Sequence, residues 1–413
     1  MNKEYVRNAA IPATGGGRFA RALREAMPDN WSLLMAAFSS AYGIGLLAML
    51  VLPFMISSTM NGLHIDEAQA GLLGTAEFLA VMLASLAVSP FIGRIPRRTI
   101  AVIGACLAIG GNVASVFQGS YEVLLFLRPV VGFGCGLALA AGNATVANAD
   151  NPEKLAAQMS VLFVVLMVLA MEVFSRISDS WGFAGVYGAL AVFMLCLAGF
   201  LFKLPQRANA TLRATKEHPH AHRGLFSAVS LLMLVAMFAF ALRDTMMWAF
   251  AERIGQAAGY STEQLGSLFS IQAVLGIAGP MLASVIGGRN GLKRPAMLGI
   301  VMTGIVTFTI LQSSNAKLPY TIGVLFISGT YFYALSYLTA VAAELDVEGR
   351  VVAASGGFLV AGVAIGPAVS GFLIVHGGYD LASWVNSGIV VLTLLLLLVP
   401  LGALKSQADR LRT

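Results

Sequence analysis

A succession of long apolar runs, separated by short polar segments, constrains this chain more than any other feature. About 20 apolar residues in a helix cross the hydrocarbon core of a bilayer, because each residue advances about 1.5 Å. The runs are too long and too uniformly apolar for the alternating strands of a membrane β-barrel. We therefore predict an all-α membrane protein with twelve transmembrane helices. The predicted spans are residues 31–58, 68–92, 99–118, 121–147, 155–177, 181–202, 224–251, 262–287, 295–314, 318–343, 351–375 and 380–404.

The composition supports this class and excludes others. Hydrophobic residues make up 58% of the 413 residues and charged residues only 11%, whereas about 25% of a soluble domain is charged. Three cysteines exclude a secreted disulfide scaffold, and the apolar content excludes an intrinsically disordered chain. The first span follows a polar segment without a small-residue cleavage site, so we expect a retained helix rather than a signal peptide.

The distribution of Lys and Arg predicts the orientation. Most of the 26 basic residues lie in segments that would share one side of the membrane with the N-terminus. Cytoplasmic loops carry such an excess of Lys and Arg. We therefore expect a multi-pass protein of the inner (plasma) membrane with both termini in the cytoplasm. The net charge of +6 follows from this bias, and it gives no reason to expect a nucleic-acid partner.

The chain divides into two similar halves. Its longest interior polar stretch, residues 203–223, separates six predicted spans from six. Four residues of the first half recur in the second at an offset of 195 residues (264 − 69): Gln69, Gly71, Gly93 and Arg94 return as Gln264, Gly266, Gly288 and Arg289. Such paired halves are typical of transporters whose site lies near the midplane. The predicted organisation is an N-terminal tail (1–30), a six-helix bundle (31–202), a linker (203–223), a second pseudo-symmetric six-helix bundle (224–404) and a C-terminal tail (405–413).

Two segments carry a resemblance to a known family. After the second span, Ser89–Arg98 reads SPFIGRIPRR, and the fourth span contains RPVVGFGCG at Arg128–Gly136. The chain resembles the major facilitator superfamily over essentially its whole length. The first segment is similar to the family's signature between helices 2 and 3, and the second to its Arg-x-x-x-Gly-x-Gly pattern. The proline of Leu52-Pro53 in the first span is similar to the first-helix proline of the 12-helix drug:proton antiporter branch, and the chain most resembles that branch.

The resemblance implies an alternating-access transporter that is not an enzyme, needs no cofactor or metal, acts as a monomer and uses a proton gradient. In the family, the signature loop helps to lock the two halves together on the cytoplasmic side. The residues that it implies for gating are Gly93, Arg94, Arg97, Arg98 and Arg289. This chain has Gly93 where the family has an aspartate and Pro96 where it has a glycine. The antiporter Gly-Pro motif is absent from the fifth span, and a similar pattern occurs at 362–371 in the eleventh.

Ionisable residues inside the hydrocarbon are costly and generally functional. Three acidic residues fall well inside predicted spans and are our candidates for proton coupling: Glu77, Glu172 and Asp244. A carboxylate in a dry cavity holds a proton that a nearby arginine displaces. The alternative for Glu77 is a static ion pair with Arg128 that holds the helices of the first half together. Its repeat partner is the neutral Gln272, so the titrating group would belong to one half only.

The candidate substrate-binding residues combine charge, amides and aromatic rings: Arg128, Arg243, Tyr42, Asn143, Gln272, Tyr331 and Tyr333. Rings such as those of the tenth span stack on planar ligands, and the alternative is ordinary helix packing. For Arg243 two roles are open: it binds an anionic group of the substrate, or it forms a salt bridge to the N-terminal half that closes the outer gate. It cannot face Asp244, because neighbours on a helix point about 100° apart.

Other residues are expected to be structural. Glu252 and Arg253 should be solvated at the outer mouth, and the three cysteines should be small core residues. Alternating histidines at residues 218–222 are expected to form a solvated linker rather than a metal site. The chain has no Walker-type phosphate loop, which excludes an ATP-driven pump.

These observations predict a proton-coupled secondary transporter that exports a small amphipathic or aromatic organic molecule by alternating access. One alternative is proton-coupled uptake of an organic anion, with Arg128 or Arg243 as the anchor. The other is a membrane sensor or lipid-handling protein that keeps the fold without coupled transport.

Overall fold

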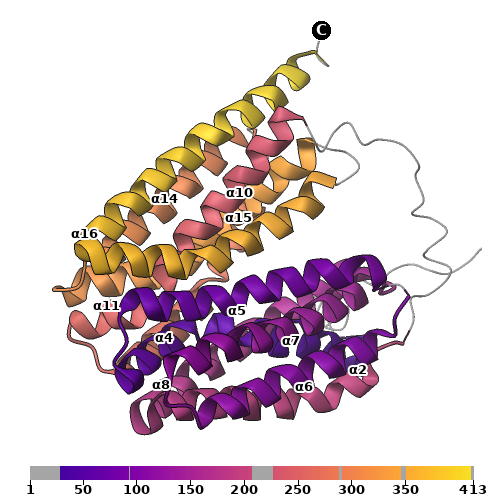
Figure 1. The fold of residues 1–413 in the computed structure, drawn as a ribbon. Helices are drawn as coiled ribbons and strands as arrows, with labels where there is room; N and C mark the ends of the chain where they lie inside the picture. The colour runs from indigo at the N-terminus through magenta and orange to yellow at the C-terminus, as the bar shows by residue number, and fades with distance from the viewer. Residues whose placement is uncertain (1–27, 93, 207–226, 288–290, 346–349, 411–413) are drawn as a thin grey trace, which may run out of the picture.

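The computed structural model describes residues 28–92, 94–206, 227–287, 291–345 and 350–410, and every regular element among them is a helix. Two groups of helices lie one above the other in Figure 1. The N-terminal group comprises α2 (Trp31–Phe38), the π-helix η1 (Ser39–Ile44), α3 (Leu47–Leu50), α4 (Leu52–Leu63), α5 (Glu67–Val88), η2 (Ser89–Phe91), α6 (Arg97–Val116), α7 (Tyr121–Ala147), α8 (Pro152–Ala198) and η3 (Gly199–Lys203). The C-terminal group comprises α10 (Ala228–Trp248), α11 (Ala251–Ala257), α12 (Thr262–Leu275), α13 (Ala278–Ile286), α14 (Lys293–Leu311), α15 (Lys317–Leu345) and α16 (Arg350–Arg410).

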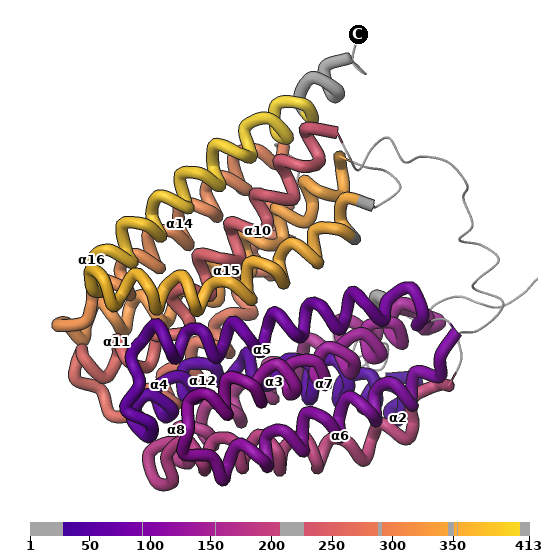
Figure 2. The backbone as a smooth tube through the Cα atoms, in the orientation of Figure 1, coloured from indigo at the N-terminus to yellow at the C-terminus, as the bar shows by residue number. Residues whose placement is uncertain are grey.

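Nine stretches of helix among the described residues are long and apolar enough to cross a membrane. Two of them are long enough to cross twice. Helix α8 has 47 residues and α16 has 61, whereas about 20 residues suffice for one crossing. Both contain non-helical glycines, Gly182 in α8 and Gly377 with Gly378 in α16. Gly182 and Gly378 have positive φ values of 58° and 65°, which glycine adopts without strain. Figure 2 shows the chain turning back within α16.

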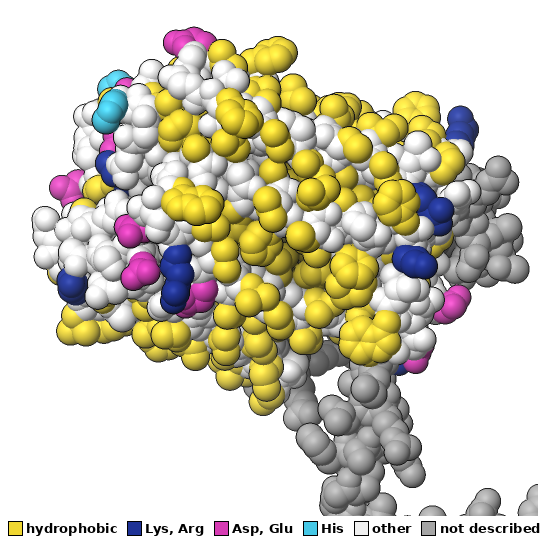
Figure 3. All heavy atoms as spheres, turned by 90° about the horizontal axis from the view of Figure 1, so that it is seen from below, with side chains coloured by type: hydrophobic (Ala, Val, Ile, Leu, Met, Phe, Trp, Pro, Cys, Tyr) yellow, Lys and Arg dark blue, Asp and Glu magenta, His cyan; other side chains and the backbone are white. Residues whose placement is uncertain are grey.

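The surface is that of a membrane protein. Figure 3 shows apolar side chains gathered over the middle of the visible face, with charged side chains mainly toward its two ends. Large apolar residues such as Phe126, Val285 and Leu195 are strongly exposed along the helices. Exposed apolar surface of this extent requires a lipid solvent. The chain is therefore a multi-pass membrane protein.

The cysteines partly depart from expectation. Cys135 is buried, as predicted, but Cys106 and Cys196 are exposed. They lie on outward faces of α6 and α8, where a thiol meets lipid as a small apolar group.

The sequence repeat marks equivalent helix starts. Gln69 completes a capping box with Asp66 at the start of α5, and Gln264 completes one with Ser261 at the start of α12. In each box the glutamine side chain accepts a hydrogen bond from the capping residue's backbone N–H, at 3.2 and 3.1 Å respectively. The recurrence of glutamine is therefore explained by helix capping.

The two groups touch chiefly at one end. We call the end with Gln206 and Ser227 the linker end, and the end with the starts of α5 and α12 the far end. The groups approach each other at the far end, near α4 and α11, and diverge toward the linker end (Figure 1). The repeated glycines allow close approach there: a side chain on Gly71 would collide with the backbone of Pro367, and one on Gly266 with Ser175.

Polar contacts reinforce this junction. Trp248 Nε1 of α10 donates to the Met49 carbonyl at 3.2 Å, and the Ala368 N–H donates to Thr75 Oγ1 at 3.0 Å. Arg253 of α11 donates to Asn61 Oδ1 at 2.9 Å. Each bond joins one group to the other, so the far half of the interface is held by direct contacts.

Candidate functional site

A cavity of about 220 Å³ lies between the two groups. The N-terminal group supplies only apolar walls, and the C-terminal group supplies apolar, aromatic and polar ones. The lining residues are Leu46, Met49, Leu50, Phe163 and Met167 on one side and Asp244, Met247, Trp248, Gln272, Ile327, Ser328, Tyr331, Phe332 and Leu335 on the other.

Irregular helices build the N-terminal wall. Helix α2 continues into π geometry in η1, and the helical path then bends at Gly45 and Leu46 and breaks again at Val51 before α4. Pro53 is tolerated in the first turn of α4, where its missing N–H would have no helical partner. Leu46, Met49 and Leu50 face the cavity between these breaks. Discontinuous helices of this kind surround the sites of many transporters.

Asp244 brings the only carboxylate among the described residues that line the cavity. It lies in α10, one turn before the helix ends at Trp248. Its Oδ1 atom is buried and has no hydrogen-bond partner within the part of the chain that the structure describes. The residue 195 positions earlier is the apolar Met49, which lines the opposite wall. A bare carboxylate in such a place is costly unless a proton or a cation neutralises it.

Gln272 adds a second acceptor to the same cavity. Its Nε2 donates to Ser328 Oγ on α15, which fixes the amide. Its Oε1 is buried and, among the described residues, accepts no hydrogen bond. Two residues that line the cavity, Asp244 and Gln272, therefore each carry a buried acceptor oxygen without a partner among the described residues, which a ligand with N–H donors would satisfy.

Aromatic rings line the same cavity. Tyr331 stacks on Phe240 with ring centroids 5.0 Å apart and an interplanar angle of 19°. Trp248 packs against Phe269 at 5.3 Å. Tyr331 and Trp248 also line the cavity. Flat apolar walls with few polar atoms are suited to a planar or amphipathic molecule.

Arg243 does not line the cavity, in contrast to our prediction. Its guanidinium group points into the C-terminal group, where it donates to Thr307 Oγ1 at 2.7 Å and to Thr303 Oγ1 at 3.1 Å. It also lies over the Phe240 ring at 4.9 Å. Neighbouring residues on a helix point in different directions. Packing against α14 turns Arg243 inward and leaves Asp244 at the cavity.

Arg128 and Glu77 form a buried network inside the N-terminal group. Arg128 Nη1 lies 3.4 Å from Glu77 Oε2 and 3.2 Å from Asn112 Oδ1. Nη2 donates to Ser115 Oγ, and the guanidinium carbon lies 4.3 Å from the centre of the Tyr187 ring. Both charged residues are 0% exposed and neither lines the cavity. The geometry favours the static ion pair over direct contact with cargo.

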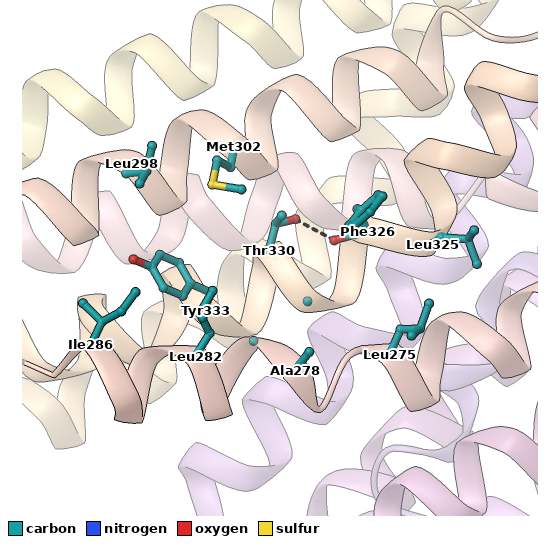
Figure 4. Close-up of a pocket in the computed structure, with 12 residues that line it drawn as sticks. Leu275, Ala278, Leu282, Ile286, Leu298, Met302, Leu325, Phe326, Thr330 and Tyr333 are labelled. Atoms are coloured by element: carbon teal, nitrogen blue, oxygen red, sulfur yellow. Dashed lines mark hydrogen bonds between the residues drawn. The ribbon is translucent and has the colours of Figure 1, made fainter.

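The remaining predicted residues lie away from the cavity. Glu172 is part-exposed, 3.8 Å from Arg176 one helical turn later. Asn143 is exposed on α7. Tyr42 lies behind the wall, packed on Phe163 at 5.0 Å. Tyr333 lines a different, apolar pocket of about 330 Å³ with Leu282 and Met302 (Figure 4). The sequence specifies helix and depth for these residues, but not the face on which each one lies.

The three predicted gating residues that the structure describes, Arg94, Arg97 and Arg98, make no hydrogen bond or ion pair to the C-terminal group in this conformation. Arg94 is exposed, and Arg98 Nη2 donates to the Leu204 carbonyl at 3.1 Å. The Arg97 N–H donates to the Gln206 carbonyl at 3.3 Å. These bonds hold the start of the linker against α6. Gly93 and Arg289 lie outside the described residues, as do the histidines at 218–222.

Two residues were missed or misjudged from the sequence. Trp248 is not among the predicted site residues, yet it lines the cavity and donates to the Met49 carbonyl of the other group. Glu252 was expected in solvent, but it is 1% exposed, because α11 packs against α4. The one sequence signal that could have identified both residues is their position near the break between α10 and α11. The surface that buries them comes from the other half of the chain.

Comparisons with known proteins agree with this architecture. The sequence profile of the Major Facilitator Superfamily matches residues 33–347, more than half of the chain. Two solved structures of the nucleoside transporter NupG, one of them a mutant, are similar to it. The mutant structure has a TM-score of 0.69 at 14% identity, and the match covers 89% of this chain and 98% of that one. The other structure has a TM-score of 0.67 with the same identity and coverage.

Comparison with curated protein sequences finds no match. At 14% identity the likeness to NupG shows the fold alone, whereas the family match extends over most of the helices described above. The chain is therefore a transporter that needs no cofactor and is not an enzyme, and it belongs to the major facilitator superfamily.

Proposed function

We propose that this transporter exports a small aromatic or amphipathic organic cation in exchange for protons. The observation that carries the proposal is the pair of unsatisfied oxygens, Asp244 Oδ1 and Gln272 Oε1, in an otherwise apolar and aromatic cavity. A protonated amine or a heterocyclic cation satisfies both oxygens and stacks on Tyr331 or Trp248. Export follows the resemblance of Leu52-Pro53 to the antiporter branch.

Asp244 couples cargo to protons in this proposal. An ionised carboxylate is unfavourable in the empty cavity, so it carries either a proton or the positive charge of the cargo. Cargo that enters displaces the proton, and a proton that enters displaces the cargo. Exchange follows because the state with neither partner is the costly one. Glu77, our other candidate in a buried position, is already paired with Arg128.

Movement follows from the arrangement of the two groups. We propose twelve crossings in two six-helix bundles, with α8 and α16 each crossing twice. Rocking would break the far-end contacts and bring the groups together at the linker end. Arg98 bonds to the Leu204 carbonyl near the linker end, and Arg94 precedes it in the chain, which supports a cytoplasmic location for that end under the positive-inside rule. The cavity lies within one chain, which is consistent with a monomer acting alone.

A second candidate cargo is a neutral nucleoside-like molecule. The two NupG structures reported above are described as nucleoside transporters. The same two oxygens would accept hydrogen bonds from a base or a sugar, and the same rings would stack on the base. This candidate needs no positive charge. Uptake of an organic anion is disfavoured, because the Nη donors of Arg128 and Arg243 bond inside their own groups and neither residue lines the cavity.

Fluorescence of Trp248 tests the proposal, because this indole lines the cavity. We expect saturable quenching of the purified protein by ethidium, an aromatic cation, and none by uridine or benzoate at equal concentration. Trp248→Phe should remove the signal, whereas Trp384→Phe, which changes an exposed indole, should preserve it. Quenching by uridine alone would favour the nucleoside candidate. Quenching that survives Trp248→Phe would place the binding site elsewhere.

A further inference from the structure

Glu252 is a buried carboxyl group in the contact that closes the far end. It lies in α11 of the C-terminal group, which packs against α4 of the N-terminal group. The residue is 1% exposed. Next to it, Arg253 bonds to Asn61 of α4 at 2.9 Å. Glu252 therefore belongs to the far-end gate, which we define as the contact between α4 and α11.

The surroundings of Glu252 favour the neutral acid. Its Oε1 accepts a hydrogen bond from Gln256 Nε2 at 2.9 Å, but its Oε2 is buried without a partner among the described residues. It forms no salt bridge with any described residue, since Arg253 is turned toward Asn61. A buried carboxylate with one unsatisfied oxygen and no ion pair is strongly destabilised.

Polar and charged groups of several neighbouring helices act on Glu252. The hydroxyl groups of Ser57 on α4 and Thr262 on α12 face it and favour the ionised form. Arg253 on its own helix favours the ionised form, and Asp179 of α8 opposes it. The buried phenol of Tyr320, on α15, also faces it. Burial outweighs Arg253 and raises the pKa of Glu252 from an ordinary value of 4.5 to about 8.

The position of Glu252 makes its burial depend on the gate. Ser57, which faces it, lies 195 residues earlier (252 − 57), the spacing of the internal repeat. Equivalent residues of two pseudo-symmetric halves meet at the axis between them. When the groups separate at the far end, α4 leaves α11 and water reaches the carboxyl group. The same residue is thus dry in the closed gate and solvated in the open one.

We propose that Glu252 is a proton-binding site of the far-end gate, so that the gate closes with the proton bound and releases it to the far side on opening. The inference goes beyond the proposed function, because it depends neither on the cargo nor on Asp244. Group separation is the conformational change, and the proton is the ligand that biases it.

The direction of the pH effect follows from linkage. The closed gate binds the proton more tightly than the open gate, so low pH favours closure. This advantage is complete below the solvated pKa, near 4.5, and is lost as pH rises through the closed-gate pKa of about 8. Between these values the closing equilibrium constant should fall up to about tenfold for each pH unit.

Spin labels across the gate provide the test. His64 and Ala257 are exposed on opposite groups near the far end, so H64C and A257C can carry labels in a full-length chain whose native cysteines are replaced. Labelling also removes the nearby imidazole. We expect the short-distance population to fall as pH rises from 5 to 9. In Glu252→Gln it should remain dominant at every pH. The matched control Glu263→Gln, an exposed acid on α12, should retain the full pH response.

Two further measurements keep the proposal testable even if Glu252→Gln does not fold. The labelled chain with native Glu252 is itself informative, because a closed population independent of pH would overturn the proposal without any substitution at Glu252. Asp244→Asn should keep the gate's pH response. If Asp244→Asn removes that response and Glu252→Gln leaves it intact, the proton site lies in the cavity and the inference is wrong.

Discussion

Asp244→Asn should abolish accumulation driven by a pH gradient and weaken binding of an aromatic cation about 10- to 100-fold. The substitution keeps the shape of the side chain but removes the charge that neutralises the cargo, and hydrogen bonds to charged groups contribute about 1.5–3 kcal/mol. The amide also supplies N–H donors where the cavity now offers acceptors. Transport into proteoliposomes with an imposed pH gradient measures the first effect, and ethidium binding measures the second.

The matched control for Asp244→Asn is Glu172→Gln. Glu172 lies in a membrane helix of the other half, is part-exposed and does not line the cavity. This variant should transport at the native rate. If Glu172→Gln loses pH-driven accumulation while Asp244→Asn keeps it, the coupling carboxylate lies in α8, and the assignment of the cavity acid is wrong.

Arg128→Ala should destabilise the folded protein by about 3–5 kcal/mol, because it leaves the Glu77 carboxylate buried without a partner. The cation–π contact with Tyr187 and the bonds to Asn112 and Ser115 are lost as well. Thermal unfolding in detergent and the yield of folded protein in the membrane measure the change.

A compensated variant separates structure from function in this network. Replacing both charges, as in Arg128→Met with Glu77→Met, should recover much of the stability, because apolar pairs often replace buried ion pairs without loss. Transport should recover with it if the network only holds the helices together. An Arg128→Ala protein that is fully stable yet inactive would contradict this account and return Arg128 to the transport site.

The sequence predicted the helices well because bilayer thickness imposes a length that apolar runs reveal directly. The repeat at an offset of 195 was also informative, and the structure explains Gln69 and Gln264 as capping residues. Predictions of breaks inside a span were less accurate. The breaks at Leu46 and Val51 lie within the predicted span 31–58, whose apolar pattern runs through them without interruption, whereas the turns at Gly182 and Gly378 lie at or beside predicted span ends.

The site was harder to predict than the fold, because it depends on which face of each helix meets the other half. Arg243 and Asp244 are adjacent in sequence, yet one is bonded inside its group and the other faces the cavity. Glu252 is polar and follows a helix end, which favours solvent exposure, yet α4 covers it. The covering surfaces come from residues nearly 200 positions away, and no local pattern specifies them.

Proton release on cargo binding tests the central claim most directly. Purified protein at about pH 5 in a lightly buffered solution is mixed with ethidium, and a pH-sensitive dye records the protons set free. If Asp244 exchanges its proton for the charge of the cargo, about one proton appears for each cation bound, and Asp244→Asn releases none. Stoichiometric cation binding without proton release from the native protein, or equal release from Asp244→Asn, would contradict the account.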